Sequence, residues 1–432
     1  MKHYGDICGL SGYELQEVDC ICGGSPCQDI SVAGKKVGIL EGERSNLFFE
    51  QVRIVKEMRE RTNGRKPRYM VWENVPAIIG GSEGRQFRKV LQEVIKVSET
   101  KAPDLPLPNN GGGGRWSNSG CLYDVLGRWS VAWRIFDSQF WGVPQRRKRI
   151  ALVADYGGLS APEILFERKG NTWDSKESRK EEKNTSRTIK KGSDSSVWHL
   201  QGNEIWRGNT TECKGNGFQP DISYTLNTTD RHATTVNAQE LLSKDIVLIE
   251  MTSTKNTIVN DGICPTLTAR MGTGGNQVNA IFNPNKAELI MRGIDVPKTE
   301  MKNKFVRKLI PLETERLQGL PDNWTDIGEW VDSKGKTHKE SSDSARYKAV
   351  GNSIALPVFS YVLKRISAQY ERPATMGSLF DGIGAFPLIW TRCNGTGTVL
   401  WASEIEEFPI AVCKKHFGDE DTGEQGDIRN YL

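Results

Sequence analysis

Apolar side chains follow two different periods in the first third of the chain. Residues 18–22 (VDCIC) and 68–72 (RYMVW) are short apolar runs bounded by turn residues, which is typical of buried strands. Between them, a helix is predicted over residues 46–61, with an apolar face formed by Leu47, Phe48, Val52, Val55 and Met58. The same patterns then predict a helix over 85–97 and strands over 130–138 and 149–155. This alternation indicates a parallel α/β sheet.

The pattern changes after about residue 156. From there to about residue 305 the chain is polar and rich in Thr, Asn and Gly, and no helix can be traced. Two segments in this stretch, 219–233 and 262–275, each place a Thr-Leu dipeptide before a basic, polar turn. Helical periodicity returns over 309–324 and 351–366. The middle of the chain therefore reads as a separate, variable lobe.

A second α/β piece follows residue 375. Its pattern predicts, in order, a strand over 376–380, a helix over 385–393, a strand over 398–404 and a helix over 406–417. The sequence between the first strand and helix, Asp381–Gly384 (DGIG), is a tight glycine turn. We therefore expect one α/β lobe that is built from both ends of the chain.

Composition narrows the class of protein only a little. The chain has 432 residues, 37% of them hydrophobic, and a net charge of +4. Basic runs at 53–68 and 168–191 fit either a solvated face or a nucleic-acid contact. No apolar signal core opens the chain and no run of apolar residues could span a bilayer, so we expect a cytoplasmic protein. Nine cysteines without paired Cys and His clusters predict reduced thiols and no structural metal.

Four short segments carry residues with candidate chemistry. Cys27 lies in the stiff turn GGSPCQ after a predicted strand, where a nucleophile can be exposed at the carboxyl edge of a sheet. Glu73 ends the next strand, where a carboxylate can donate a proton or bind a ring nitrogen. In QRRKRI, alternation predicts Arg147 and Arg149 on one face, suited to phosphate or carbonyl oxygens. Glu404, one strand after the glycine turn, is placed to bind ribose hydroxyls. Each segment taken alone also has an ordinary structural explanation, as a packed cysteine, a helix cap or a solvated loop.

As a set, these segments resemble the DNA (cytosine-5) methyltransferases, and most closely the phage and bacterial members. The resemblance rests on FDGIG, ASEIE, GDI, GGSPCQDIS, LFFE, WENVP, QRRKRI, LIPLETERLQGLPDNW and YKAVGNSIALPV. It implies a Rossmann-like, S-adenosylmethionine-dependent α/β sheet with a smaller target-recognition lobe inserted. The implied divisions are 1–156 (catalytic lobe, nucleophile half), 157–305 (target recognition domain), 306–366 (return to the catalytic lobe), 367–375 (linker) and 376–432 (cofactor-binding part).

The resemblance also implies a role for each matching residue. Cys27 would attack carbon 6 of a flipped-out cytosine, Glu73 would contact ring nitrogen 3 and the exocyclic amine, and Arg147 and Arg149 would hold the base. The implied catalytic set is Cys27, Glu73, Asn74, Arg147 and Arg149. The implied S-adenosylmethionine site comprises Phe380, Asp381, Gly382, Ile383, Gly384, Glu404, Ile405, Asp6, Ile7, Pro26, Asn352 and Ser353. The implied substrate contacts are Ser25, Gln28, Ser31 and Gln145.

The order of the segments departs from the pattern of the family. Most members begin with the FDGIG segment and end with GNSIALP, whereas here FDGIG follows GNSIALP. This order resembles a circularly permuted member, which is physically tolerable because chain termini often lie close together. The tripeptide GDI occurs at Gly5–Ile7 and again at Gly426–Ile428, and the first copy takes the family's adenine-contacting role.

The resemblance further implies double-stranded DNA as the partner, no membrane, and a bacterial cell or phage-infected host as the setting. We expect a monomer on DNA, with any cognate restriction endonuclease acting independently. Two rival functions are weighed against this one. RNA cytosine methyltransferases usually carry their cysteine after the strand that here ends in WENVP, which lacks one, whereas an RNA cytosine methyltransferase on this same DNA-type scaffold stays open as the alternative. A silent DNA-binding decoy usually lacks part of the catalytic set, which is complete here.

Overall fold

The computed structural model describes residues 1–26, 47–108, 114–166 and 309–432, together with the backbone of the short strands β8 to β14 between residues 198 and 282. The chain divides into two compact units. Unit 1 comprises Met1–Phe136, Lys148–Trp173 and Val358–Leu432, and unit 2 comprises Asp137–Arg147 and Asp174–Pro357. Unit 1 thus takes residues from both ends of the chain, as expected from the sequence.

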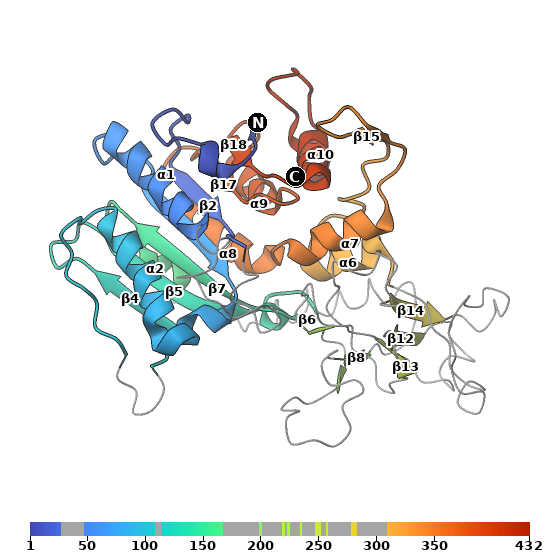
Figure 1. The fold of residues 1–432 in the computed structure, drawn as a ribbon, viewed down its shortest axis with the longest axis horizontal. Helices are drawn as coiled ribbons and strands as arrows, with labels where there is room; N and C mark the ends of the chain where they lie inside the picture. Colours follow the sequence, from blue (N-terminus) through green and yellow to red (C-terminus); the bar gives the residue numbers. More distant parts are fainter. Residues whose placement is uncertain are drawn as a thin grey trace. The chain divides into compact units, whose positions relative to one another are not determined.

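Unit 1 is built on an eight-stranded sheet in the order β1-β18-β17-β2-β3-β7-β5-β4 (Figure 1). The strands are β1 Lys2–Tyr4, β2 Cys20–Gly23, β3 Tyr69–Asn74, β4 Ser119–Tyr123, β5 Ser130–Asp137, β7 Lys148–Asp155, β17 Met376–Leu379 and β18 Val399–Ser403. The last two strands of the chain, β17 and β18, therefore lie between the first two.

The sheet is mixed rather than wholly parallel. From β1 to β3 every neighbouring pair is parallel. β7 then runs antiparallel to β3, and β4 pairs antiparallel with β5. The parallel sheet that the alternation predicted is thus confirmed for one half of the sheet only. In the other half, the antiparallel neighbours β4 and β5 are joined by a short turn, so no helix lies between these two strands in the sequence.

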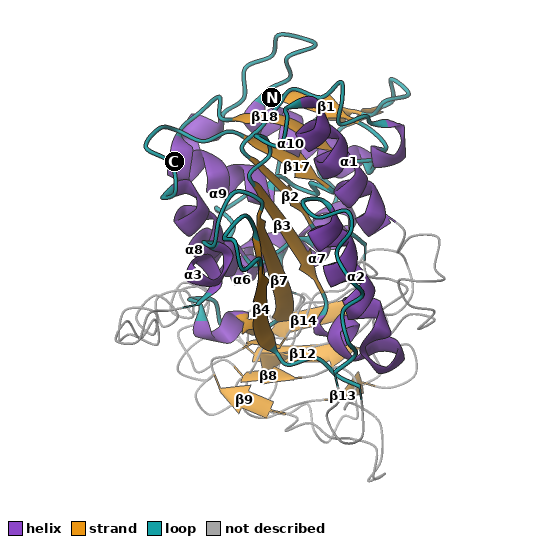
Figure 2. Ribbon diagram, turned by 90° about the vertical axis from the view of Figure 1, so that its left-hand side faces the viewer, coloured by secondary structure: helices purple, strands orange, loops and turns teal. Residues whose placement is uncertain are grey.

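Helices cover both faces of this sheet. Figure 2 shows α1 and α2 on one side and α8 and α9 on the other. The unit 1 helices are α1 Leu47–Arg61, α2 Arg85–Lys96, α3 Ala161–Leu165, α8 Leu356–Ser367, α9 Ala385–Asn394 and α10 Glu407–Phe417. Short 3-10 helices span Ile7–Gly9, Pro76–Gly84 and Ile428–Tyr431. The α1 face predicted from the sequence packs into the core, where Phe48, Val55 and Met58 are fully buried.

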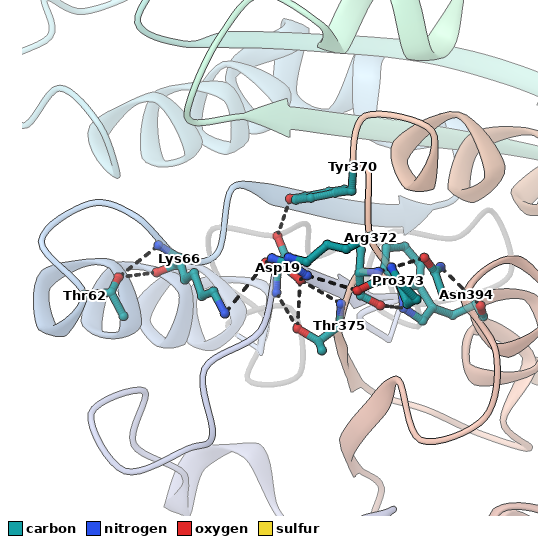
Figure 3. A network of polar contacts seen from close by, with 10 residues as sticks. Asp19, Thr62, Lys66, Tyr370, Arg372, Pro373, Thr375 and Asn394 are labelled. Carbon is teal, nitrogen blue, oxygen red and sulfur yellow. Dashed lines mark hydrogen bonds and ion pairs between the residues drawn. The ribbon is translucent and has the colours of Figure 1, made fainter.

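Asp19, immediately before β2, fastens the segment that leads into β17 (Figure 3). Both carboxylate oxygens of Asp19 accept 2.7 Å bonds from the Arg372 guanidinium. The amide of Thr375 donates to the same carboxylate at 2.8 Å, and its hydroxyl donates at 3.0 Å. Burial opposes the ionisation of Asp19, but the bonds from Arg372 and Thr375 outweigh it and lower the pKa. This contact joins two segments of unit 1 that are far apart in the sequence.

We expect Arg372→Met to lower the free energy of unfolding by about 1.5–3 kcal/mol, because a nearly buried carboxylate loses its charged donor. This decrease in the free energy of unfolding should reach its full size above pH 3.8, the ordinary pKa of an aspartate. It should become smaller as the pH falls through the lowered pKa of Asp19. Urea denaturation at several pH values measures it. Arg85→Met is the matched control, since Arg85 is similarly exposed but pairs with exposed Glu83. Equal effects of the two substitutions would contradict the prediction.

Unit 2 contains shorter elements. In the described part of unit 2, the helices are α6 Pro311–Gln318 and α7 Asp343–Asn352, with a 3-10 helix at Ser138–Phe140. Its strands are β6 Gln145–Arg146, β8 Trp198–Leu200, β9 Phe218–Pro220, β10 Ser223–Tyr224, β11 Thr234–Thr235, β12 Val247–Met251, β13 Asn256–Thr257, β14 Val278–Phe282, β15 Trp330–Val331 and β16 Thr337–His338. β12 pairs antiparallel with β13 and β14, and β8 with β9 and β11. In the part of the chain that is described, no helix is long and apolar enough to cross a membrane.

Candidate active site at the carboxyl edge of the sheet

Four strands of unit 1 end in one row across the sheet, and β3 crosses the same row two residues before its own end. The register aligns Tyr4, Ser403, Leu379, Gly23 and Trp72. All five strands run in the same direction, so the residues that follow this row emerge at a single edge. The predicted site residues that follow it are Asp6, Glu404, Phe380, Asp381, Ser25, Pro26, Glu73 and Asn74. The sheet thus gathers segments from both ends of the chain.

Glu73 and Arg149 form an ion pair at this edge. Arg149 Nε lies 2.8 Å from Glu73 Oε1, and both side chains are only about one-tenth exposed, at 12% and 11%. β3 and β7 are antiparallel neighbours, so the end of β3 lies beside the beginning of β7. Gly24 leaves room for the carboxylate, since a Cβ there would lie 3.0 Å from Glu73 Oε2. A guanidinium thus fixes the carboxylate that the sequence predicted as catalytic.

The turn after β2 is held by side chains of β3. Asn74 Nδ2 donates to the Ser25 carbonyl at 3.1 Å, and Trp72 Nε1 donates to Ser25 Oγ at 2.9 Å. Asn74 and Ser25 are both buried. These contacts fix the backbone just before Cys27. Pro26 is the last residue described in this turn, and the predicted site residues Cys27, Gln28 and Ser31 lie outside the described residues.

The glycine turn between β17 and α9 has an unusual backbone. Phe380, Gly382 and Gly384 have φ angles of +53°, +57° and +76°, in the left-handed region that favours glycine. A Cβ on Gly382 would meet nothing within 4 Å, whereas one on Gly384 would lie 2.6 Å from the Phe417 ring. Gly384 therefore lets the turn pack against α10, and Gly382 leaves the backbone open. Ile383 is buried beneath the turn.

Glu404 lies beside this turn and binds backbone amides. Its Oε2 accepts from Gly382 N at 2.8 Å, and its Oε1 accepts from Ile405 N at 2.7 Å and from Glu406 N at 2.9 Å. The Ile405 side chain is 66% exposed. A carboxylate, an open backbone and an exposed apolar side chain therefore lie together, which suits a ligand with hydroxyl groups and an apolar ring.

The two copies of GDI are in different surroundings. The first follows β1, where Ser403 Oγ donates to Gly5 O and the exposed Asp6 accepts from Cys8 N at 2.9 Å. Ile7 is buried in the core. In the second copy, Asp427 Oδ1 lies 2.6 Å from His416 Nδ1. Each aspartate precedes a 3-10 helix, but of the two only the first copy follows a strand of the eight-stranded sheet.

Two of the predicted site residues of unit 2, Arg147 and Ser353, contact each other. Arg147 is buried and donates through Nη2 to the Ser353 carbonyl at 2.6 Å, and Gln145 Nε2 donates to the Leu317 carbonyl at 2.8 Å. Asn352 is exposed at the end of α7, and Ser353 is buried. The sequence placed Arg147 and Arg149 on one face of a single strand. That expectation was wrong, because the chain breaks between β6 and β7 at Arg147 and the two arginines bind different partners.

Sequence reasoning missed two residues that bind the first residue of the glycine turn, Asp381. Ser378 Oγ donates to Asp381 Oδ1, and Cys413 Sγ donates to Asp381 Oδ2 at 3.2 Å. Ser378 lies in a buried strand and Cys413 in an amphipathic helix, where both look like packing residues. Only the tertiary structure brings them to the turn. Among the described residues no group of three or more His, Cys, Asp or Glu side chains could hold a metal ion.

Comparison with known proteins identifies the class to which this sheet and site belong. The model of the C-5 cytosine-specific DNA methylase family matches residues 1–98 and 123–368. The chain belongs to this family, which confirms the resemblance drawn from the motifs.

Individual relatives share only about a quarter of their aligned residues with this chain. A DNA N-6-adenine-methyltransferase of Escherichia phage P1 is 26% identical over 417 residues, covering 82% of this chain and 53% of that protein. The Type II methyltransferase M1.ScrFI of Lactococcus lactis subsp. cremoris is 25% identical over 381 residues, covering 85% and 67%. The chain thus spans about half the length of the phage P1 relative. Among solved structures, the S. pombe Dnmt2 methyltransferase aligns over 84% of this chain and 83% of its own, with a TM-score of 0.39 and 14% identity.

Proposed function

We propose that this chain is a DNA (cytosine-5) methyltransferase that transfers a methyl group from S-adenosylmethionine to carbon 5 of a cytosine in duplex DNA. The observation that carries the proposal is the row across the sheet. It delivers the turn leading to Cys27, the Glu73–Arg149 pair, the glycine turn and Glu404 to one edge. Membership of the C-5 cytosine-specific DNA methylase family supports the same reaction.

The proposed mechanism assigns separate tasks to the residues at this edge. Cys27 as thiolate adds to carbon 6 of the cytosine, which makes carbon 5 nucleophilic. Glu73, held by Arg149, binds the ring-nitrogen side of the base and limits the negative charge that develops on the ring. Carbon 5 would bond to the methyl carbon that S-adenosylmethionine supplies, as the bond between that carbon and the cofactor sulfur breaks. The methylated carbon 5 then loses its proton and the Cys27 thiolate leaves carbon 6, which restores the aromatic ring. The cytosine must be flipped out of the duplex, since these carbons cannot be reached inside the base stack.

The residues around the glycine turn fit S-adenosylmethionine, which would supply the methyl group. Gly382 offers open backbone, Glu404 offers carboxylate oxygens for hydroxyl donors, and exposed Ile405 offers apolar surface for a purine ring. These three residues would hold the cofactor. Asp6, on the neighbouring strand end, is exposed and could accept a further hydrogen bond.

Glu73→Gln should lower kcat for methyl transfer by about 10²-fold, since the neutral amide cannot balance a proton on the ring nitrogen. The Kd for cofactor should change little, because Glu73 lies on another strand end than the glycine turn. Single-turnover methylation assays measure the rate, and Glu83→Gln, which alters an exposed carboxylate, is the control. A loss below about threefold would remove Glu73 from the catalytic set.

Circular permutation is part of the proposal. In the sheet, β17 and β18 lie between β1 and β2, although they are the last two strands in the sequence. The family match stops at residue 368, before the glycine turn. Both observations support a rotated segment order, with the linker at 367–375. The Asp19–Arg372 contact fastens this linker to β2 within unit 1.

The DNA partner and the recognition of its base sequence by this chain also belong to the proposal. The segment 157–305 would read bases in the major groove, and its basic run at 168–191 would contact phosphates. Binding should then weaken steeply with salt. Action as a monomer, independence from any restriction endonuclease and a cytoplasmic setting remain predictions.

The testing experiment is transfer of a labelled methyl group from S-adenosylmethionine to mixed-sequence duplex DNA. Sequencing should report both 5-methylcytosine and N6-methyladenine, because the phage P1 relative is named for adenine. We expect 5-methylcytosine at one recurring short motif. N6-methyladenine alone would overturn the proposed base, labelled RNA in a parallel reaction would favour the RNA function, and binding without transfer to either would favour the decoy.

A further inference from the structure

The glycine turn is built over a buried carboxyl group. Asp381 is the first residue of the turn between β17 and α9, and it is buried. Figure 1 draws this part of unit 1 in orange to red. Its Oδ1 accepts from the Ser378 hydroxyl, and its Oδ2 accepts from the Cys413 thiol at 3.2 Å. The backbone ties it in as well, since Asp381 N donates to Ser403 O and Gly384 N donates to Asp381 O. Thus Asp381 connects β17, β18, the turn and α10.

The Cys413 thiol has two acceptors and one proton. Its Sγ lies 3.2 Å from Asp381 Oδ2 and 3.2 Å from the carbonyl oxygen of Gly382. An S–H group can donate to only one of them at a time. When Asp381 is ionised, its oxygen is the stronger acceptor and takes the thiol proton. When Asp381 is protonated at that oxygen, the thiol turns to Gly382 O, so protonation changes the hydrogen bonding of the turn.

No described cation accounts for the ionisation of this carboxyl group. The side chains that act on Asp381 are Ser378 from β17, Cys413 from α10 and Glu404 after β18, and none of these three is a cation. The first turn of α9 adds no acidic residue. Burial, and to a lesser extent the charge of Glu404, raise the pKa of Asp381, while the bonds from Ser378 and Cys413 lower it; together these effects place the pKa at about 7. A buried acid that titrates near neutral pH inside a ligand-binding turn indicates a functional role.

We propose that Asp381 is a proton-linked positioning residue, whose ionised form, held by Ser378 and Cys413, sets the glycine turn to receive the cationic cofactor. The inference rests on the proposed function, because it takes S-adenosylmethionine as the ligand. Its sulfonium ion carries a positive charge, which favours the carboxylate over the neutral acid. Binding and loss of the Asp381 proton are therefore coupled, and each favours the other.

The expected result is a proton release that can be counted without any methyl transfer. With a pKa of about 7 in the free protein, binding at pH 7 should release about half a proton from Asp381, and the Kd for S-adenosylmethionine should rise about tenfold from pH 8 to pH 6. Isothermal titration calorimetry in buffers of different ionisation enthalpy measures both quantities. Binding of the product S-adenosylhomocysteine, which lacks the sulfonium charge, should release fewer protons from Asp381.

Matched variants separate this role from a structural one. Asp381→Asn keeps the shape of the side chain but cannot titrate. The proton release measured when S-adenosylmethionine binds this variant therefore comes from other groups, including the amino group of the ligand, and is subtracted from the release measured with the wild type. Cys413→Ala removes a donor to the carboxylate and should move the midpoint of the pH profile upward, whereas Cys413→Ser should restore it. Cys393→Ala, a cysteine on α9, is the control and should match the wild type.

Each outcome has a distinct meaning. If the folded wild type binds no S-adenosylmethionine at any pH, the proposed function fails. If it binds with equal proton release in the wild type and in Asp381→Asn, the positioning role of Asp381 is wrong while the function stands. If Asp381→Asn does not fold, the midpoint shift between Cys413→Ala and Cys413→Ser decides, and its absence overturns the proposal.

Discussion

Cys27→Ser should lower methyl transfer to cytosine by on the order of 10³-fold or more, with little change in the Kd for DNA or cofactor. A serine hydroxyl ionises far less readily than a thiol and is a much weaker nucleophile at neutral pH, so addition to carbon 6 becomes very slow. The structure gives the substitution a fixed frame, since β2 ends at Gly23 and the following turn is bound through Ser25 to Trp72 and Asn74. Only the reacting atom changes.

A trapping assay tests the same cysteine independently of turnover. Duplex DNA with 5-fluorocytosine at the target position cannot lose a proton from carbon 5, so the adduct should persist as a complex that survives denaturation. The wild type should form this complex and Cys27→Ser should not. Cys121→Ser, which alters an exposed thiol on β4, should behave as the wild type. If Cys27→Ser keeps a tenth of the activity, covalent catalysis through this residue is contradicted.

Local patterns predicted the elements well where burial is strong and regular. The face of α1 and the strands β3, β17 and β18 follow directly from apolar periodicity, because each element packs one face or both against the core. The predicted strand over 68–72 stopped two residues short of the end of β3. The sequence reasoning missed β1 and β4, which are edge strands with little burial, and α7. α7 carries buried Arg346 and Tyr347 among charged neighbours, so its apolar stripe is weak.

The site could be predicted in part for a related reason. Asp6 follows β1, which the apolar pattern missed, so its assignment rested on the GDI motif. Glu73 lies at the end of β3 and Glu404 directly follows β18, and a position at a strand end is readable from sequence. Their partners are not. The pairing of Glu73 with Arg149 depends on β7 running antiparallel beside β3, and the pairing of Asp381 with Cys413 depends on how α10 packs. Sheet order and helix packing are tertiary properties, so a motif can locate a carboxylate without locating its partner.

The second large effect is expected in unit 2, where Arg346→Met should lower the local stability of α6 and α7 by about 3–5 kcal/mol. Glu315 on α6 is fully buried, and Arg346 on α7, whose side chain is only 9% exposed, lies 3.1 Å from its Oε1. Arg346 also donates to the Thr325 hydroxyl at 3.0 Å, and Thr325 N donates to Glu315 at 2.9 Å. Without the Arg346 guanidinium, Glu315 is left as a buried carboxylate that has lost its ion-pair partner.

Hydrogen exchange of the amides in α6 and α7 measures this loss within unit 2 and does not require the whole chain to unfold in one step. Arg316→Met is a matched control one residue from Glu315, because Arg316 pairs with half-exposed Asp322 and should cost at most about 1 kcal/mol. Glu315→Gln in the Arg346→Met background should recover part of the stability, since the buried charge is then absent. Equal exchange in Arg346→Met and Arg316→Met would mean that the buried pair does not hold these helices together.

The helices α6 and α7 also flank the carbonyls that Arg147 and Gln145 bind, at Ser353 and Leu317. Loosening them should therefore also speed exchange at the amides of Ser353 and of the residues next to Arg147, although neither arginine substitution touches those contacts.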